Sequence, residues 1–234
     1  MANNFTAFFP SKLLLFGEHI VLKGAKALAL PYPALGGSWK YNESKNQQTL
    51  KEFGVYLHEV CNGWFDLNDF QKELDKGLYF DSNIPVGYGL GSSGALVAGV
   101  YDRFCDKRAV GLNELQLRLA QMENFFHSNS SGIDPLVCYQ QEMLVIDPNT
   151  GISPVPDWVL NDNKQWTVFL LDTQKARKTG PLVHHFLHLN ESVDFSTAIQ
   201  KVGIPLNNEL LHLFLQNKWH QLAEGWKQFS KFQQ

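Results

Sequence analysis

The residues best suited to chemistry lie in a glycine-rich segment at positions 85–95, which reads PVGYGLGSSGA. Glycine adopts positive φ readily, so successive N–H groups can turn toward one point and form an anion cradle. A helix that begins at Ser92 or Ser93 adds the positive end of its dipole at the same place. The segment therefore predicts a phosphate-binding loop. A plain glycine-rich turn, with Ser92 or Ser93 as a helix N-cap, is the alternative that the segment alone leaves open.

Three further clusters carry groups that can transfer a proton or stabilise charge. The first places a lysine before a carboxylate and an imidazole, the second is a polar turn that ends in an aspartate, and the third is a basic turn with a threonine. These clusters are Lys12 with Glu18 and His19, residues 127–134, and residues 175–180. Together with the loop, they favour phosphate chemistry over a purely structural turn.

Two common nucleotide-binding motifs do not fit the loop. A P-loop requires a lysine followed by serine or threonine after its last glycine, whereas Ser92 directly follows Gly91. A dinucleotide fingerprint reads GxGxxG and needs an acidic residue about 20 positions later, whereas this loop reads GxGxG and lacks a convincing acid there. The loop therefore belongs to another class of phosphate-binding segment.

The motifs and their order resemble those of the GHMP kinase superfamily, and within it most of all the mevalonate kinases. PVGYGLGSSGAL is similar to the phosphate-binding signature P-x-G-x-G-L-G-S-S-A-A, and KLLLFGEHIVLKG is similar to an opening motif with a lysine before G-E-H. HSNSSGIDP resembles the turn H-G-x-x-S-G-I/V-D, and RKTGPLV is similar to a later turn whose threonine lies near the substrate. The resemblance covers residues 8–183 and departs mildly from the family at Ser11, Gly94 and Ser128.

The resemblance implies an enzyme that uses ATP and Mg²⁺ to phosphorylate a small-molecule alcohol, with the 5-hydroxyl of mevalonate as the favoured acceptor. It implies that Asp134 takes the proton of that hydroxyl and that Lys12 stabilises the charge beside it. It implies Ser93 and Glu123 as ligands of Mg²⁺, an ion that prefers few protein oxygens. The residues implied for the phosphates of ATP are Gly87, Gly89, Leu90, Gly91, Ser92, Ser93 and Gly94, and those implied for the acceptor are Glu18, His19 and Thr179.

Each role has a structural alternative. Ser131-x-x-Asp134 also reads as a capping box, Lys12 could be a solvated strand residue, and Glu123 could lie on a solvated helix face. His19 could be a half-buried strand residue bonded to a backbone carbonyl. Two other functions stay open for the whole chain: a kinase of the same family that acts on phosphomevalonate, a sugar or homoserine, and a non-catalytic GHMP-fold protein that binds a nucleotide or a metabolite.

The composition indicates a globular protein without a nucleic-acid or membrane partner. The 234 residues carry a net charge of -3, are 44% hydrophobic and contain no long basic run. No apolar stretch approaches the roughly 20 residues that span a bilayer. Widely spaced cysteines without a CxxC pair favour reduced, buried thiols. Because no basic leader precedes the first apolar stretch, we expect a cytoplasmic protein, and we leave a homodimer open.

Apolar periodicity and glycine positions predict an α+β fold, with strands early in the chain and helices later. The resemblance implies a two-domain GHMP kinase-like fold: an ATP-binding, ribosomal protein S5 domain 2-like part at residues 1–160, and the start of an α/β domain at residues 161–234. We expect this second domain to be truncated, because no clustered glycines follow Gly132. The expected strands are 5–9, 12–16, 19–22, 27–30, 77–84, 143–147 and 166–172. The expected helices are 47–62, 67–76, 92–105 and 112–127, together with an amphipathic helix near the end of the sequence that is marked by Trp219, Leu222, Trp226 and Phe229.

Overall fold

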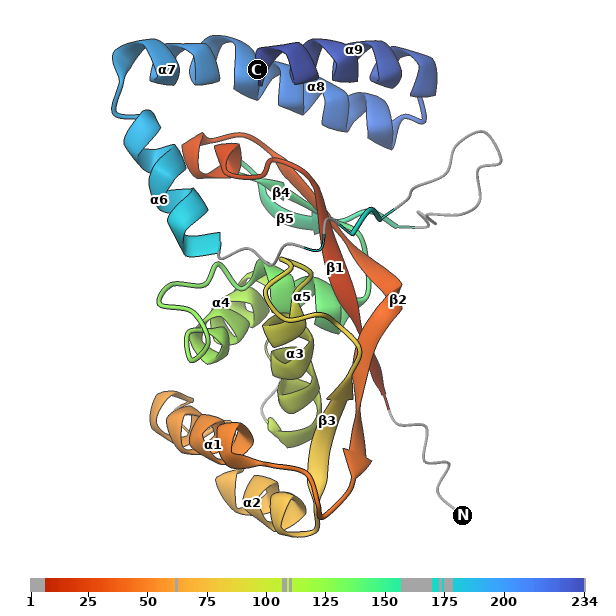
Figure 1. The fold of residues 1–234 in the computed structure, drawn as a ribbon, viewed down its shortest axis with the longest axis vertical. Helices are drawn as coiled ribbons and strands as arrows, with labels where there is room; N and C mark the ends of the chain where they lie inside the picture. Colours follow the sequence, from red (N-terminus) through yellow and green to blue (C-terminus); the bar gives the residue numbers. More distant parts are fainter. Residues whose placement is uncertain are drawn as a thin grey trace. The chain divides into compact units, whose positions relative to one another are not determined.

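The computed structural model describes residues 7–61, 63–106, 109, 111–156, 170–172, 174 and 179–233 (Figure 1). The chain divides into two compact units, the first made of Met1–Leu13 and Pro31–Glu142 and the second of Leu14–Leu30 and Met143–Gln234. The combination of helices with a β-sheet confirms the predicted α+β class. The predicted domain boundary between residues 160 and 161 lies outside the described residues.

A five-stranded sheet within the described residues has the order β1-β2-β4-β5, and β3 also pairs with β2. The strands are β1 (Phe8–Phe16), β2 (Ala27–Tyr41), β3 (Leu78–Ser82), β4 (Leu144–Asp147) and β5 (Gly151–Pro154). Strand β2 pairs antiparallel with β3 through residues 37–41 and with β4 through residues 27–29. Because β2 is 15 residues long, it contributes to both compact units.

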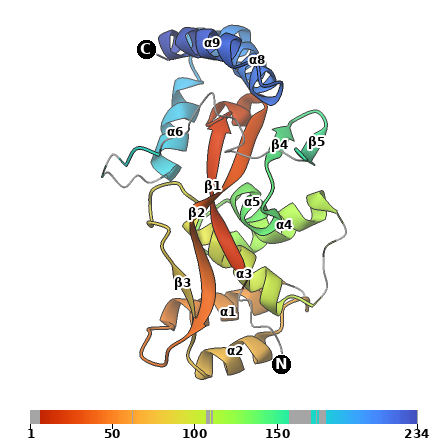
Figure 2. The ribbon, with the colours of Figure 1, turned by 90° about the vertical axis from the view of Figure 1, so that its right-hand side faces the viewer.

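Helix α3 (Ser92–Phe104) is the centre of the first unit, since most of its residues are buried. It lies beside α5 (Ile133–Gln140) in both views of the ribbon (Figure 1, Figure 2). Gly99 lets α3 approach the sheet: a Cβ at this position would lie 2.9 Å from the Phe80 ring, and the Gly99 carbonyl accepts a hydrogen bond from Trp39 Nε1 at 3.1 Å. Further helices of this unit are α1 (Gln48–Val60), α2 (Leu67–Asp75) and α4 (Leu112–Glu123).

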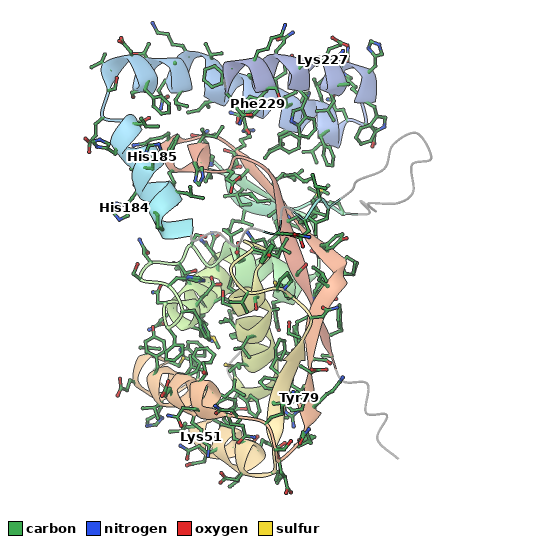
Figure 3. The ribbon with its side chains drawn as sticks, viewed as in Figure 1. Lys51, Tyr79, His184, His185, Lys227 and Phe229 are labelled. Carbon is green, nitrogen blue, oxygen red and sulfur yellow. The ribbon has the colours of Figure 1, made fainter. Side chains whose placement is uncertain are left out.

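Helices dominate the second unit. They are α6 (Thr179–Leu189), α7 (Val193–Ala198), a π-helical segment η2 (Ile199–Gly203), α8 (Ile204–Leu215) and α9 (Trp219–Phe232). A short 3₁₀ helix, η1 (Ile20–Lys23), contributes Ile20 to an apolar cluster with Phe186 and Ile199. Phe229 of α9, labelled in Figure 3, packs against this cluster. The cluster joins the early segment of the chain to the late helices within this unit.

Two asparagines of α8 hold residues 17–26 in the second unit. Asn207 accepts a hydrogen bond from the Gly17 amide at 3.0 Å and donates one to the Lys26 carbonyl at 2.9 Å. Asn208 accepts a hydrogen bond from the Lys26 amide at 2.9 Å. Asn207 is buried, so its side chain replaces water for two backbone groups that would otherwise be left without a partner.

The predicted strand at residues 19–22 is wrong, because this segment leads into the 3₁₀ helix η1. Its apolar run is typical of a strand, but Gly17 and Gly24 adopt φ of 90° and 97° and turn the chain on either side. His19 also has a positive φ of 63°, which no strand residue adopts. The turns, which the hydrophobic pattern does not reveal, therefore decide the local structure.

Apart from the predicted strand at 166–172, the other predicted elements agree in type where they are described. The described parts of the predicted strands 5–9 and 12–16 belong to one strand, β1, and the predicted strand 27–30 forms the beginning of β2. Strands β3 and β4 lie within the predicted strands 77–84 and 143–147. The predicted helices correspond to α1, α2, α3, α4 and α9, whereas the sequence patterns do not anticipate α5 and β5. Of the predicted strand 166–172, residues 166–169 lie outside the described residues, and residues 170–172 form no strand.

The cysteines are structural thiols. Cys61, Cys105 and Cys138 are buried and form no disulfide, as their spacing predicts. Burial raises the pKa of the Cys61 thiol to about 12, so this group stays protonated at neutral pH. Across the described part of the chain, every helix is too short or too polar to cross a membrane.

Replacing Asn207 with alanine is expected to lower the free energy of unfolding by about 2–3 kcal/mol, because the Gly17 amide and the Lys26 carbonyl lose their buried partner. Urea denaturation measures the change. Gln228→Ala, at an exposed position of α9, is the control and should alter stability by less than about 0.5 kcal/mol. Equal stability of the two variants would contradict this role of Asn207.

Candidate functional site

The glycine loop of the first unit has the backbone conformation of an anion cradle. Gly87, Gly89 and Gly91 adopt positive φ of 82°, 72° and 76°. Gly91 is the N-cap of α3, and no side chain caps this helix. The alternative in which Ser92 or Ser93 caps the helix is therefore wrong.

The amides at the start of α3 are available to a ligand. Among the described residues, the amides of residues 89–94 donate to no protein acceptor. Gly87 and Gly89 are exposed, whereas Leu90 and Gly91 are buried and anchor the end of the loop. Unsatisfied amides and the dipole of a 13-residue helix make this end of α3 attractive to a phosphate.

Lys12 and Asp134 form an ion pair, with Lys12 Nζ and Asp134 Oδ1 2.8 Å apart. The Lys12 side chain is only 10% exposed, and the Asp134 side chain is 36% exposed. A lysine this buried requires a charged partner, so the alternative of a solvated strand lysine is wrong. The Lys12 amide also donates to the Leu90 carbonyl at 3.0 Å, which ties β1 to the glycine loop.

Asp134 is the second residue of α5 and does not belong to a capping box. Gly132 is the N-cap of α5, with φ of 72° and no side-chain cap. The Ser131 hydroxyl instead accepts a hydrogen bond from the Ile133 amide at 3.4 Å. The carboxylate of Asp134 therefore pairs with Lys12 while it lies near the positive end of the α5 dipole.

Two glycines permit the close approach that forms this pair. A Cβ at Gly91 would lie 2.9 Å from Lys12 Cγ, and a Cβ at Gly94 would lie 2.9 Å from the backbone of Asp134. The departure from the usual family alanine at position 94 thus has a steric reason. With glycine there, the start of α3 packs directly against the start of α5.

Glu123 is buried at the end of α4 and accepts hydrogen bonds from two serines. Ser93 Oγ donates to Glu123 Oε1 at 2.9 Å, and Ser130 Oγ donates to Oε2 at 2.5 Å. His127 Nε2 lies 3.0 Å from Ser93 Oγ. Glu123 is only 3% exposed, so the alternative of a solvated helix face is wrong.

Two carboxylates share this site, and their electrostatics suit a cation. Burial, followed by the negative charge of Asp134, raises the pKa of Glu123, whereas the hydrogen bonds from Ser130 and Ser93 lower it. The pKa of the Cys138 thiol is raised well above its usual value, chiefly by burial and then by Asp134. A bound cation would offset the repulsion between the two carboxylates.

The donor set fits Mg²⁺ better than a metal held by protein alone. Ser93 and Glu123 supply a hydroxyl and a carboxylate that are already in contact. The described residues contain no group of three or more histidine, cysteine, aspartate or glutamate residues that could hold a metal ion. Mg²⁺ commonly takes one or two protein oxygens together with phosphate oxygens and water, which matches this sparse set.

The residues predicted to contact an acceptor belong to the second unit. Glu18 is exposed, and the His19 ring stacks on Phe186 with the ring centroids 5.7 Å apart. His19 precedes η1 and is not the strand residue of the structural alternative. Thr179 is the first residue of α6, and its side chain lies outside the described part of the structure. Their contact with an acceptor stays a prediction.

Two polar residues join the site without having been predicted as site residues. His127 contacts Ser93, and Ser130 binds Glu123. His127 lies four residues after Glu123, a spacing that places both on one side of a helical turn and provides a sequence signal. Ser130 gives no such signal, because its contact depends on how the turn at 127–132 folds back.

Comparisons with known proteins associate this site with one family. The family model for the GHMP kinases N terminal domain matches residues 56–142, which include Ser93, Glu123 and Asp134. Mevalonate kinase of Pyrococcus furiosus is 28% identical over 160 residues, which cover 55% of this chain and 47% of that protein. The chain thus spans about half the length of this curated relative.

Solved structures of kinases share the fold. Mevalonate kinase of Methanococcus jannaschii matches with a TM-score of 0.54 and 16% identity, over 95% of this chain and 80% of that chain. L. major mevalonate kinase in complex with R-mevalonate matches with a TM-score of 0.58 and 14% identity, over 97% of this chain and 73% of that chain. Lactococcus lactis galactokinase complexed with galactose matches with a TM-score of 0.56 and 16% identity, over 95% of this chain and 73% of that chain. These similarities confirm the predicted GHMP kinase-like fold.

Replacing Glu123 with glutamine is expected to stabilise the ligand-free protein at neutral pH. Because the pKa of Glu123 is raised, its carboxyl group binds a proton more tightly in the folded chain than in the unfolded chain, where the pKa of this group is near 4.5. The ionised carboxylate therefore destabilises the fold increasingly as the pH rises above about 4.5 through the folded pKa. We expect Glu123→Gln to raise the melting temperature at pH 7 by about 2–4 °C, the response to about 1 kcal/mol in a chain of this size.

Scanning calorimetry at pH 7 and pH 4 measures this effect, which should fade at the lower pH because both states are then largely protonated. Glu142→Gln, at an exposed position, is the control and should leave the melting temperature unchanged at both pH values. A lower melting temperature of Glu123→Gln at pH 7 would contradict the destabilising role of the buried charge.

Proposed function

We propose that the chain transfers the γ-phosphoryl group of ATP to the hydroxyl of a small-molecule alcohol, with mevalonate as the favoured acceptor, because it is similar to the GHMP kinases N terminal domain and to a mevalonate kinase. The observation that carries this proposal is the Lys12–Asp134 ion pair, which is tied through the Lys12 amide to the phosphate-binding loop. A binding module needs the loop alone, whereas phosphoryl transfer to an alcohol also needs a group that receives a proton.

The loop and the start of α3 would hold the phosphates of ATP. The unsatisfied amides of residues 89–94 are hydrogen-bond donors for phosphate oxygens. Ser93 and Glu123 would hold Mg²⁺, which when bound neutralises negative charge on the phosphate oxygens. The contact between these two side chains supports their joint role.

Asp134 would accept the proton of the acceptor hydroxyl as the new phosphate ester bond forms. Its carboxylate is partly exposed, so a hydroxyl can reach it, while Lys12 fixes one of its oxygens. The Lys12 ammonium would also stabilise the negative charge that develops on the attacking oxygen. The products, which are the phosphate ester of the acceptor and ADP, then leave the site, and the proton passes from Asp134 to water.

The acceptor is the least constrained part of the proposal. The similarity to mevalonate kinases and the Gly-Glu-His sequence at residues 17–19 favour mevalonate, with Glu18, His19 and Thr179 as its contacts. The fold similarity to a galactokinase keeps a sugar as the second candidate. An assay of ADP release with mevalonate, phosphomevalonate, galactose and homoserine separates these candidates.

Replacing Asp134 with asparagine is expected to lower kcat by at least about 100-fold, because the amide cannot accept the proton. Asparagine preserves the shape of the side chain and an oxygen for Lys12, so the KM for ATP should change little. Steady-state ADP release with the preferred acceptor measures both constants. Asp75→Asn, at an exposed position of the same unit, should retain wild-type turnover.

Turnover of Asp134→Asn within a few-fold of the wild-type value would contradict the role of this carboxylate. Stabilisation of the wild-type protein by MgATP without ADP release for any acceptor would instead support a non-catalytic nucleotide-binding protein. Activity with galactose alone would move the assignment to the second candidate.

A further inference from the structure

We infer that His127 is a positioning residue, which orients the Ser93 hydroxyl for a divalent cation; this inference rests on the proposed function. His127 is exposed at the beginning of the polar turn that follows α4, and its Nε2 atom lies 3.0 Å from Ser93 Oγ. Its amide donates to the Glu123 carbonyl at 3.2 Å, which holds the ring one helical turn beyond Glu123. The imidazole therefore meets Ser93 from the turn that directly follows the helix that supplies Glu123.

The direction of each hydrogen bond follows from a count of protons. A serine hydroxyl has one proton to donate and two lone pairs. An ionised carboxylate only accepts, so the Ser93 proton goes to Glu123 Oε1, 2.9 Å away. His127 must then donate its Nε2 proton to Ser93, and the neutral imidazole has to be the Nε2–H tautomer.

The second oxygen of Glu123 is fixed in the same way. Ser130 Oγ accepts a hydrogen bond from the Gly132 amide at 3.0 Å, and its only proton goes to Glu123 Oε2 at 2.5 Å. The carboxylate thus cannot rotate without breaking a bond to one of the two serines. Glu123 is held by its partners, and Ser93 is held by Glu123 and His127.

One lone pair of the Ser93 oxygen remains after these bonds are assigned. The first lone pair receives the His127 proton, so the second is the one that a cation can use. Without His127 the hydroxyl can rotate about its bond to Glu123, and both lone pairs then sample other directions. His127 therefore contributes to cation affinity without touching the cation.

The test uses Mn²⁺, which electron paramagnetic resonance detects directly, with ADP and the full chain. His127→Phe keeps a planar ring but has no donor, and we expect it to weaken Mn²⁺ binding about tenfold, the size of one hydrogen bond. His127→Gln places an amide N–H at a similar reach and should restore binding to within about threefold. His58→Phe, at an exposed position of α1, is the matched control and should bind Mn²⁺ as the wild type does.

A double-mutant cycle separates this role from a general effect on folding. In a Ser93→Ala background, His127→Phe should cause no further loss of Mn²⁺ affinity, because its hydrogen-bond partner is already absent. Equal losses in both backgrounds would overturn the inference. So would wild-type affinity in His127→Phe, or failure of His127→Gln to restore binding.

Nitrogen-15 NMR of the metal-free protein provides a readout that does not depend on nucleotide. The His127 ring should be the Nε2–H tautomer in the wild type, and this preference should be lost in Ser93→Ala. The Nδ1–H tautomer in the wild type would overturn the inference. If the wild type shows this tautomer but binds no Mn²⁺ with ADP, the proposed metal site fails while the His127–Ser93 hydrogen bond stands.

Discussion

The ion pair between Lys12 and Asp134 requires three backbone elements to meet within a few ångströms. Strand β1 supplies the lysine, α5 begins at the aspartate, and α3 begins beside both of them. This meeting is possible because Gly91 and Gly94 have no side chain, since a Cβ at either position would lie 2.9 Å from Lys12 or from the Asp134 backbone. Gly91 also has one of the three positive φ values that shape the glycine loop, so the same position serves both the loop and the contact between Lys12 and Asp134.

The site holds more negative charge than its burial favours. Glu123 is buried near Asp134 and accepts hydrogen bonds from two serines, which offset only part of the cost of its charge. Such an arrangement is typical of a site that acquires a cation, because the ligand supplies the missing positive charge. Stability is thus exchanged for a pre-organised set of oxygen donors, a compromise often found at functional sites.

Sequence motifs predict the loop, Lys12 and Asp134, because these residues carry the resemblance to a family, and the resemblance in turn implies Glu123. They do not predict the details that depend on tertiary contacts. The helix caps at Gly91 and Gly132 escape detection because serines nearby are the usual capping residues, and the turns at Gly17 and Gly24 escape detection because the segment between them is apolar. The contact of Ser130 with Glu123 depends on how one polar turn folds back, which no local pattern reveals.

Phosphorus-31 NMR of the wild-type chain with ATP, Mg²⁺ and R-mevalonate tests the central claim most directly, since it distinguishes transfer from hydrolysis and from binding alone. The account predicts a phosphomonoester resonance that grows as the γ-phosphate signal of ATP declines and the signals of ADP appear. It predicts the same change with another alcohol if mevalonate is not the acceptor. Release of inorganic phosphate alone, or unchanged ATP with every alcohol in the presence of a folded protein, would contradict it.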